Sequence, residues 1–60
     1  MNDLNLKVYY NERYNSIKIG ALIPDGMRFA GMIVIMNHDG FTFFSKDHFA
    51  EEHWIELGEL

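Results

Sequence analysis

Four short stretches of alternating apolar and polar residues divide the first 44 positions of the chain. They cover residues 4–10, 16–23, 27–36 and 41–44. In the first stretch Leu4, Leu6 and Val8 alternate with Asn5 and Lys7, and a period of two is typical of a strand with one buried face. The third stretch is apolar on both faces toward its end, which predicts a central strand covered on both sides.

Turn-forming residues separate these predicted strands. Pro24-Asp25-Gly26 is the strongest hairpin signal, and the residues from Asn37 to Gly40 form a second turn. Gly20 and Gly31 interrupt neighbouring strands, which favours a bulge or a sharp bend. We therefore expect an α+β fold that is mainly antiparallel β. The expected arrangement is a four-stranded meander, with a small SH3-like open barrel as the alternative.

The pattern changes in residues 45–60. Ser45 or Asp47 can cap a helix, and Gly58 is a natural stop. The residues at helical spacing are Phe49, Ala50, His53, Trp54 and Leu57. This spacing predicts a short C-terminal helix packed on one face of the sheet. The competing interpretation is a single helical turn followed by a closing strand at residues 54–57.

The alternation also predicts which side chains form the core. The expected core residues are Leu4, Leu6, Val8, Ile17, Ile19, Ile23, Phe29, Ile33, Ile35, Phe41, Phe43, Trp54 and Leu57. Hydrophobic residues make up 48% of the 60 positions and aromatic residues 15%, which is too rich for a disordered chain. A chain of this length forms one small domain, residues 1–60, with a thin core.

Composition restricts the compartment and the stabilising chemistry. The chain has no cysteine, so disulfides and cysteine-type zinc sites are excluded and a reducing compartment is favoured. Its first residues, Met1 to Leu6, lack the charged and apolar regions of a signal peptide. The longest apolar run, residues 29–36, is too short to cross a bilayer. We expect a cytoplasmic protein without a membrane partner.

Catalytic and metal-binding motifs are absent from the sequence. His38, His48 and His53 are the three histidines, and the last two are five residues apart rather than the four of a helical zinc motif. The chain has no serine elbow and no glycine-rich phosphate loop. We therefore expect no enzyme, no cofactor and no metal, and a function in binding.

The charge is distributed unevenly and identifies a first candidate surface. Residues 1–30 hold four Lys or Arg and three Asp or Glu, whereas residues 31–60 hold one basic and six acidic residues, and the net charge is −4. The candidate acidic surface comprises Asp47, Glu51, Glu52, Glu56 and Glu59. Such a surface can bind a basic partner. We expect an inhibitor or modulator of a nucleic-acid-handling protein, of the kind that phages and mobile elements encode.

Two alternative surfaces belong to different functional classes. A basic and aromatic surface would hold single-stranded nucleic acid by stacking and phosphate contact, although the acidic total disfavours this. Its residues are Lys7, Tyr9, Lys18 and Arg28. A methionine-rich apolar surface would instead join copies of the chain in a homodimer or larger homo-oligomer. Its residues are Met32, Val34, Met36 and Phe44.

Overall fold

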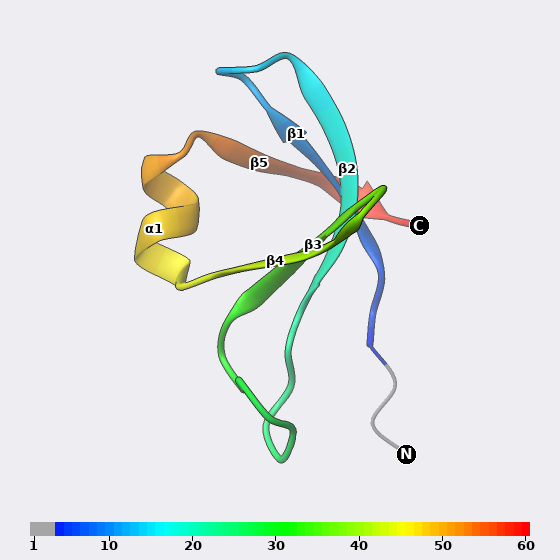
Figure 1. Ribbon diagram of the computed structural model, residues 1–60, viewed down its shortest axis with the longest axis vertical. Helices are drawn as coiled ribbons and strands as arrows, with labels where there is room; N and C mark the ends of the chain where they lie inside the picture. Colours follow the sequence, from blue (N-terminus) through cyan, green and yellow to red (C-terminus); the bar gives the residue numbers. More distant parts are fainter. Residues whose placement is uncertain (1–3) are drawn as a thin grey trace.

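The computed structural model describes residues 4–60 and shows five strands and one short helix in them. The elements are β1 (Lys7–Asn11), β2 (Ser16–Leu22), β3 (Ile33–Asn37), β4 (Gly40–Phe44), α1 (Lys46–Glu51) and β5 (Trp54–Glu59). All pairings are antiparallel, in the order β4-β3-β2-β1-β5 (Figure 1). The predicted antiparallel class is confirmed. Residues 1–3, part of the start where we expect no signal peptide, lie outside the described residues.

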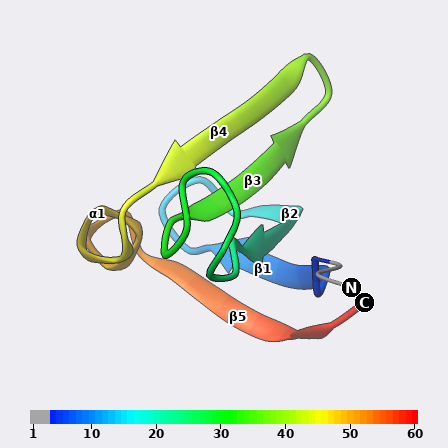
Figure 2. The ribbon, with the colours of Figure 1, turned by 90° about the horizontal axis from the view of Figure 1, so that it is seen from below.

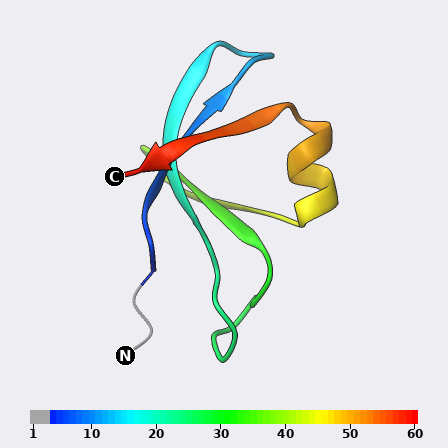
Figure 3. The same ribbon diagram turned by 180° about the vertical axis from the view of Figure 1, so that it is seen from behind.

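The tail differs from the prediction of a C-terminal helix. Helix α1 begins after Ser45, whose hydroxyl accepts a hydrogen bond from the backbone N–H of His48 at 3.2 Å. It ends at Glu51, because His53 adopts a φ of +63° and cannot continue it. Strand β5 then pairs with β1, so the closing-strand alternative is the correct one. Figure 2 shows α1 linking β4 to β5, and Figure 3 shows β5 returning from α1 to the C-terminus.

The third predicted strand is shorter than expected. Only its end forms β3, while residues 23–32 form a loop of successive turns that we call the 23–32 loop. The loop holds positive φ angles at Gly26, Phe29 and Gly31, which interrupt an extended strand. The hairpin itself is retained, because Ile23 donates to the Met32 carbonyl at 2.8 Å and accepts from the N–H of Gly31 at 2.9 Å.

The two faces of the sheet carry separate cores. On the helix face, which α1 covers, Tyr9, Ile35 and Phe49 are buried. Ile33, Phe44 and Trp54 pack against them. The rings of Phe49 and Trp54 stack at 5.6 Å, and Tyr9 meets Phe49 edge-on at 5.1 Å. The aromatic cluster thus fixes α1 on the sheet.

The opposite face, which we call the loop face, is covered by the 23–32 loop. Ala21, Ile23 and Val34 are buried there. Leu4, Leu6 and Met32 pack against them in half-buried positions. Since each face of the sheet is covered over part of its area, apolar residues are needed on both sides of the central strands.

The predicted single core is wrong, because the structure has two cores and leaves several of the predicted members exposed. Tyr9, expected on the outer face, is only 3% exposed, whereas Ile17, expected in the core, is 65% exposed. The predicted core combined Ile33 and Ile35, which lie on the helix face, with Ile23, which lies on the loop face. The alternation also did not show that the helix would cover the face bearing Tyr9.

Gly20 lies on the helix face beneath Tyr9, and a Cβ there would collide with the carbonyl oxygen of Val34. Glycine is therefore required at this position for close packing. The register of β2 with β1 and β3 does not shift at Gly20, so the bulge that we expected there is not found.

Asn11 connects the β1–β2 turn to the end of the helix. Its side chain is 1% exposed. The amide nitrogen donates to the Glu52 carbonyl at 2.8 Å, and the amide oxygen accepts from the N–H of Tyr14 at 3.0 Å. Both functions of a buried side-chain amide are thus satisfied, and this single residue joins segments that are 41 positions apart.

Candidate functional site

An apolar groove of about 260 Å³ opens on the loop face. Its lining residues come from the N-terminal segment, the 23–32 loop, β3 and β4. They are Leu4, Ile23, Met27, Arg28, Phe29, Val34, Met36, Phe41 and Phe43. Arg28 is the one charged member of this set. A concave apolar surface with a single polar group is the usual form of a binding site.

Phe29 forms the wall of the groove at a strained backbone position. Its φ is +64°, a conformation that bulky L-residues rarely adopt. The ring is 53% exposed, and its centroid lies 5.0 Å from that of Phe43 on β4. The guanidinium carbon of Arg28 lies 5.9 Å from the centroid of the same ring. The turn thus holds an aromatic ring at the surface near a cation and a second aromatic ring.

The exposed aromatic residues continue along the edge of the loop face. Phe41 is 64% exposed and Phe43 is 44% exposed. Both project from β4 to the loop face, because they pair with Met36 and Val34 of β3. Exposed aromatic rings beside a groove form the type of contiguous apolar patch that marks a contact surface.

The residues of the expected methionine-rich interface are divided between the two faces. Val34 is buried in the loop-face core and Met32 packs against it. Met36 is half-buried and lines the groove. Phe44 lies on the helix face, where it stacks on His48 at 5.5 Å. The structure therefore brings together three of the four residues. The most exposed apolar residues of the groove are instead Phe29, Phe41 and Phe43.

The residues of the expected basic and aromatic surface are also separated. Lys7, Tyr9 and Lys18 share the helix face, but Tyr9 is covered by Phe49. Arg28 lies in the 23–32 loop on the opposite side of the sheet. A stacking platform needs an accessible ring, and the ring of Tyr9 does not provide one.

The acidic residues lie on α1, at its end and along β5. Two of them form ion pairs within the chain. Glu56 accepts from the Lys7 ammonium at 3.2 Å, and Glu52 lies 3.6 Å from the guanidinium of Arg13. Asp47, Glu51 and Glu59 are exposed, and the structure pairs none of these three with a Lys or Arg among residues 4–60. Glu51 lies 3.9 Å from the imidazole of His48.

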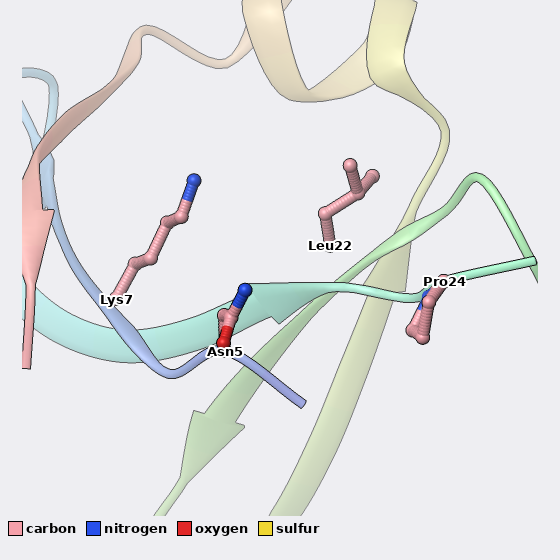
Figure 4. Close-up of a pocket in the computed structure, with 4 residues that line it drawn as sticks. All are labelled: Asn5, Lys7, Leu22 and Pro24. Carbon is pink, nitrogen blue, oxygen red and sulfur yellow. The ribbon is translucent and has the colours of Figure 1, made fainter. Parts of the chain in front are cut away.

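A second, smaller cavity of about 180 Å³ adjoins the Lys7–Glu56 pair. Its lining includes Lys7 and Leu22, whose side chains point to the same side of the sheet (Figure 4). The hydrogen bond from Lys7 to Glu56 and the charge of that carboxylate raise the pKa of Lys7. Burial raises the pKa of the neighbouring Tyr9, and Glu56 raises it further. Each shift favours the protonated form, the ammonium of Lys7 and the phenol of Tyr9.

The histidines and carboxylates of residues 4–60 contain no group of three that could bind a metal ion. In the same part of the chain, no helix has the length and apolar character needed to span a bilayer.

Sequence reasoning identified the apolar residues of the groove but not the groove. We expected Phe29, Phe41 and Phe43 in the core, because alternation in strands at 27–36 and 41–44 would place them inside. The signal for the loop was the pair of glycines that flanks Phe29, at positions 26 and 31, since both adopt positive φ angles. The sequence matches no known protein family, and neither the curated proteins nor the solved structures contain a significant match.

Proposed function

We propose that this protein is a non-catalytic protein-binding module that modulates or inhibits its partner, with the apolar groove of the loop face as its contact surface. The position of Phe29 carries the proposal. A bulky residue at φ +64° costs folding free energy of about 1–3 kcal/mol. A partner that packs against the exposed ring gives this conformation a function, since strained residues concentrate at binding sites.

The residues that line the groove indicate which chemical groups a partner would present. Eight of its nine lining residues are apolar or aromatic, and the ninth is Arg28. Arg28 forms no ion pair among residues 4–60, and it lies beside the ring of Phe29. The complementary ligand is a protein segment that inserts apolar side chains and places a carboxylate against the guanidinium.

Selection of short random peptides on the immobilised protein tests this proposal. The expected peptides carry neighbouring apolar residues followed or preceded by Asp or Glu, and they shift the NMR signals of Met36 and Phe43. Phe43→Ser should reduce capture several-fold, because it removes one wall of the groove. Arg28→Gln should abolish the preference for an acidic residue.

The matched control is Ile17→Ser, which removes an exposed apolar side chain outside the groove. It should capture the same peptides as the unmodified protein. A selection without enrichment, or equal losses for Ile17→Ser and Phe43→Ser, would refute the groove as the contact surface.

The exposed acids of α1 support a second proposal, a modulator that binds the basic surface of a nucleic-acid-handling protein. Asp47 and Glu51 lie one helical turn apart, and the structure pairs neither of them with Lys or Arg within residues 4–60. Glu52 and Glu56 contribute less charge to such a contact, because Arg13 and Lys7 partly neutralise them.

An oligolysine peptide serves as the probe of this acidic surface. NMR titration should shift the signals of α1, and the affinity should fall with added salt. The double substitution Asp47→Asn and Glu51→Gln should weaken binding, whereas Asp25→Asn, which removes an exposed acid from the 23–32 loop, should not. Binding that is unaffected by the double substitution contradicts this second proposal.

We further propose that the sheet coils into a small open barrel of the SH3-like kind. The support is the strand order, which has β5 beside β1, together with the short helix between β4 and β5. The close approach of Gly20 to Val34 gives the central strands the tight packing that a coiled sheet needs. An experimental structure with a flat sheet would contradict this arrangement.

A further inference from the structure

The two edges of the sheet differ in their protection against another strand. The outer edge of β4 pairs with no strand among residues 4–60. The sequence of β4 is Gly-Phe-Thr-Phe-Phe, without charge, proline or bulge. Folded proteins normally place at least one such device on an exposed edge, because an unprotected edge is a template for another strand.

The opposite edge, β5, carries these devices. Its register with β1 shifts between Val8 and Tyr9, which leaves Leu57 as the extra residue of a bulge. It also carries the charged side chains of Glu56 and Glu59. Since β5 is protected and β4 is not, further strand pairing is directed to β4.

The β3–β4 register specifies which groups of β4 are available. Asn37 and Gly40 flank the two-residue turn and form a hydrogen-bonded pair, after which bonded and non-bonded pairs alternate. Thr42 therefore turns its backbone N–H and carbonyl toward β3. Phe41 and Phe43 turn theirs toward the free edge.

In one antiparallel register, two copies of β4 form hydrogen bonds between their outward backbone N–H and carbonyl groups. Placing Phe41 opposite Phe43 of the second copy engages the outward groups of both residues in each strand, and it puts Thr42 opposite Thr42 on the two-fold axis. The four phenylalanine rings then lie together on the loop face, and the two threonines meet on the helix face. Aromatic pairs and threonine pairs are both favourable across antiparallel strands.

Charges at the ends of β4 agree with this register. It brings the turn residue Asp39 of one copy near Ser45 and Lys46 of the second copy, and the symmetry repeats this contact at the other end. Asp39 and Lys46 are both exposed, and neither forms an ion pair among residues 4–60. The expected contacts therefore include two opposite-charge pairs.

We propose that two copies of this chain form a symmetric dimer by antiparallel pairing of β4 with β4, centred on Thr42. The dimer has one continuous sheet of ten strands and a two-fold axis, the commonest symmetry of soluble oligomers. This inference does not rest on the proposed function. Thr42 lies on the helix face, so substitutions there leave the groove of the loop face intact.

Charge exchange at Thr42 tests the dimer and its register. The unmodified protein should show a mass that rises from monomer to dimer between micromolar and millimolar concentration in analytical ultracentrifugation. Thr42→Lys and Thr42→Asp should each weaken the dimer by about tenfold or more, because like charges meet at the axis. An equimolar mixture of these two variants should restore dimerisation, which also shows that both are folded.

Leu57→Lys is the matched control, since it places the same charge on the protected edge at an exposed position. It should dimerise like the unmodified protein. A monomeric mass of the unmodified protein throughout the concentration range overturns the proposal. Unchanged dimerisation of Thr42→Lys, or equal weakening by Leu57→Lys, overturns it as well.

A disulfide cross-link tests the axis independently. The chain has no cysteine, and directly opposed non-bonded residues have Cα atoms about 4.5 Å apart, within the range that a disulfide needs. Thr42→Cys should therefore oxidise rapidly to a covalent dimer, whereas Leu57→Cys should cross-link slowly. Equal rates for the two variants contradict pairing centred on Thr42.

Discussion

The two faces of the sheet differ in how completely they are covered. On the helix face, four aromatic rings pack together and Phe49 is 8% exposed. On the loop face, Phe29, Phe41 and Phe43 are 44–64% exposed beside a groove. The two faces contain similar residue types, so composition alone does not distinguish a core from a contact surface. The element that covers each face determines which it becomes. Helix α1 buries the aromatic residues of its face, whereas the 23–32 loop leaves part of the loop face exposed.

The largest expected loss of stability comes from a substitution in the core of the helix face. Phe49→Ala should lower the free energy of unfolding by about 3–5 kcal/mol, since it removes the ring that Tyr9 and Trp54 contact. Urea denaturation monitored by circular dichroism measures this loss, which leaves a domain of this size close to unfolded. A loss below about 1 kcal/mol is incompatible with the described packing.

A smaller loss is expected from the hydrogen-bonded connection between α1 and the β1–β2 turn. Asn11→Ala should cost about 1–3 kcal/mol, because it leaves the partly buried Glu52 carbonyl and the N–H of Tyr14 without their partner. The control Asn5→Ala, at an exposed asparagine, should change the stability by less than about 0.5 kcal/mol. Equal effects of both substitutions would mean that Asn11 does not join the two segments.

Alkaline titration tests the difference between the two faces, because the buried phenol of Tyr9 lies on the helix face. The raised pKa of Tyr9 means that the folded state retains this proton to higher pH than the unfolded state does. The associated stability is present below pH 10, the ordinary pKa, and is lost as the pH rises through the folded value. Lys7, with a pKa raised above 10.5, adds to the same decline. Tyr9→Phe should make the fall of the melting temperature above pH 10 shallower, and an unchanged slope would contradict the burial of the phenol.

The smallest expected effect is on the loop face. Phe41→Ser should change the free energy of unfolding by no more than about 0.5 kcal/mol, since the ring is 64% exposed. Thermal and urea denaturation beside Phe49→Ala provide the comparison. If both substitutions destabilise the protein equally, the two faces do not differ as described.

Sequence patterns predicted the strands well where local signals suffice. The predicted second stretch, 16–23, and fourth stretch, 41–44, match β2 and β4 within one residue, because the apolar alternation and the flanking turns are local. The side of the sheet that α1 covers depends on contacts between distant residues, so Tyr9 was assigned to the wrong environment. The helix also ended earlier than its apolar spacing suggested, because His53 adopts a left-handed conformation that the periodicity does not reveal.

The groove was the least predictable part for the same reason. The Phe29–Phe43 contact joins a loop to a strand that is separated from it by β3. The apolar pattern at 27–36 is as compatible with a strand as with a loop. The hydrogen-bonded turns that follow Pro24 make this segment a loop. The sequence shows where the acidic residues are but not which of them are neutralised. The basic partners of Glu52 and Glu56 are 39 and 49 positions away along the chain.

The conformation of Phe29 has a consequence for how the sequence can drift. Glycine adopts a φ of +64° without penalty, so an exchange of Phe29 for glycine is among the changes that a lineage under selection for heat resistance alone would accumulate early. A lineage that depends on the aromatic ring would instead keep it despite the cost. An aromatic residue at position 29 in natural variants of this chain therefore indicates that the groove binds a partner, whereas glycine indicates that it does not.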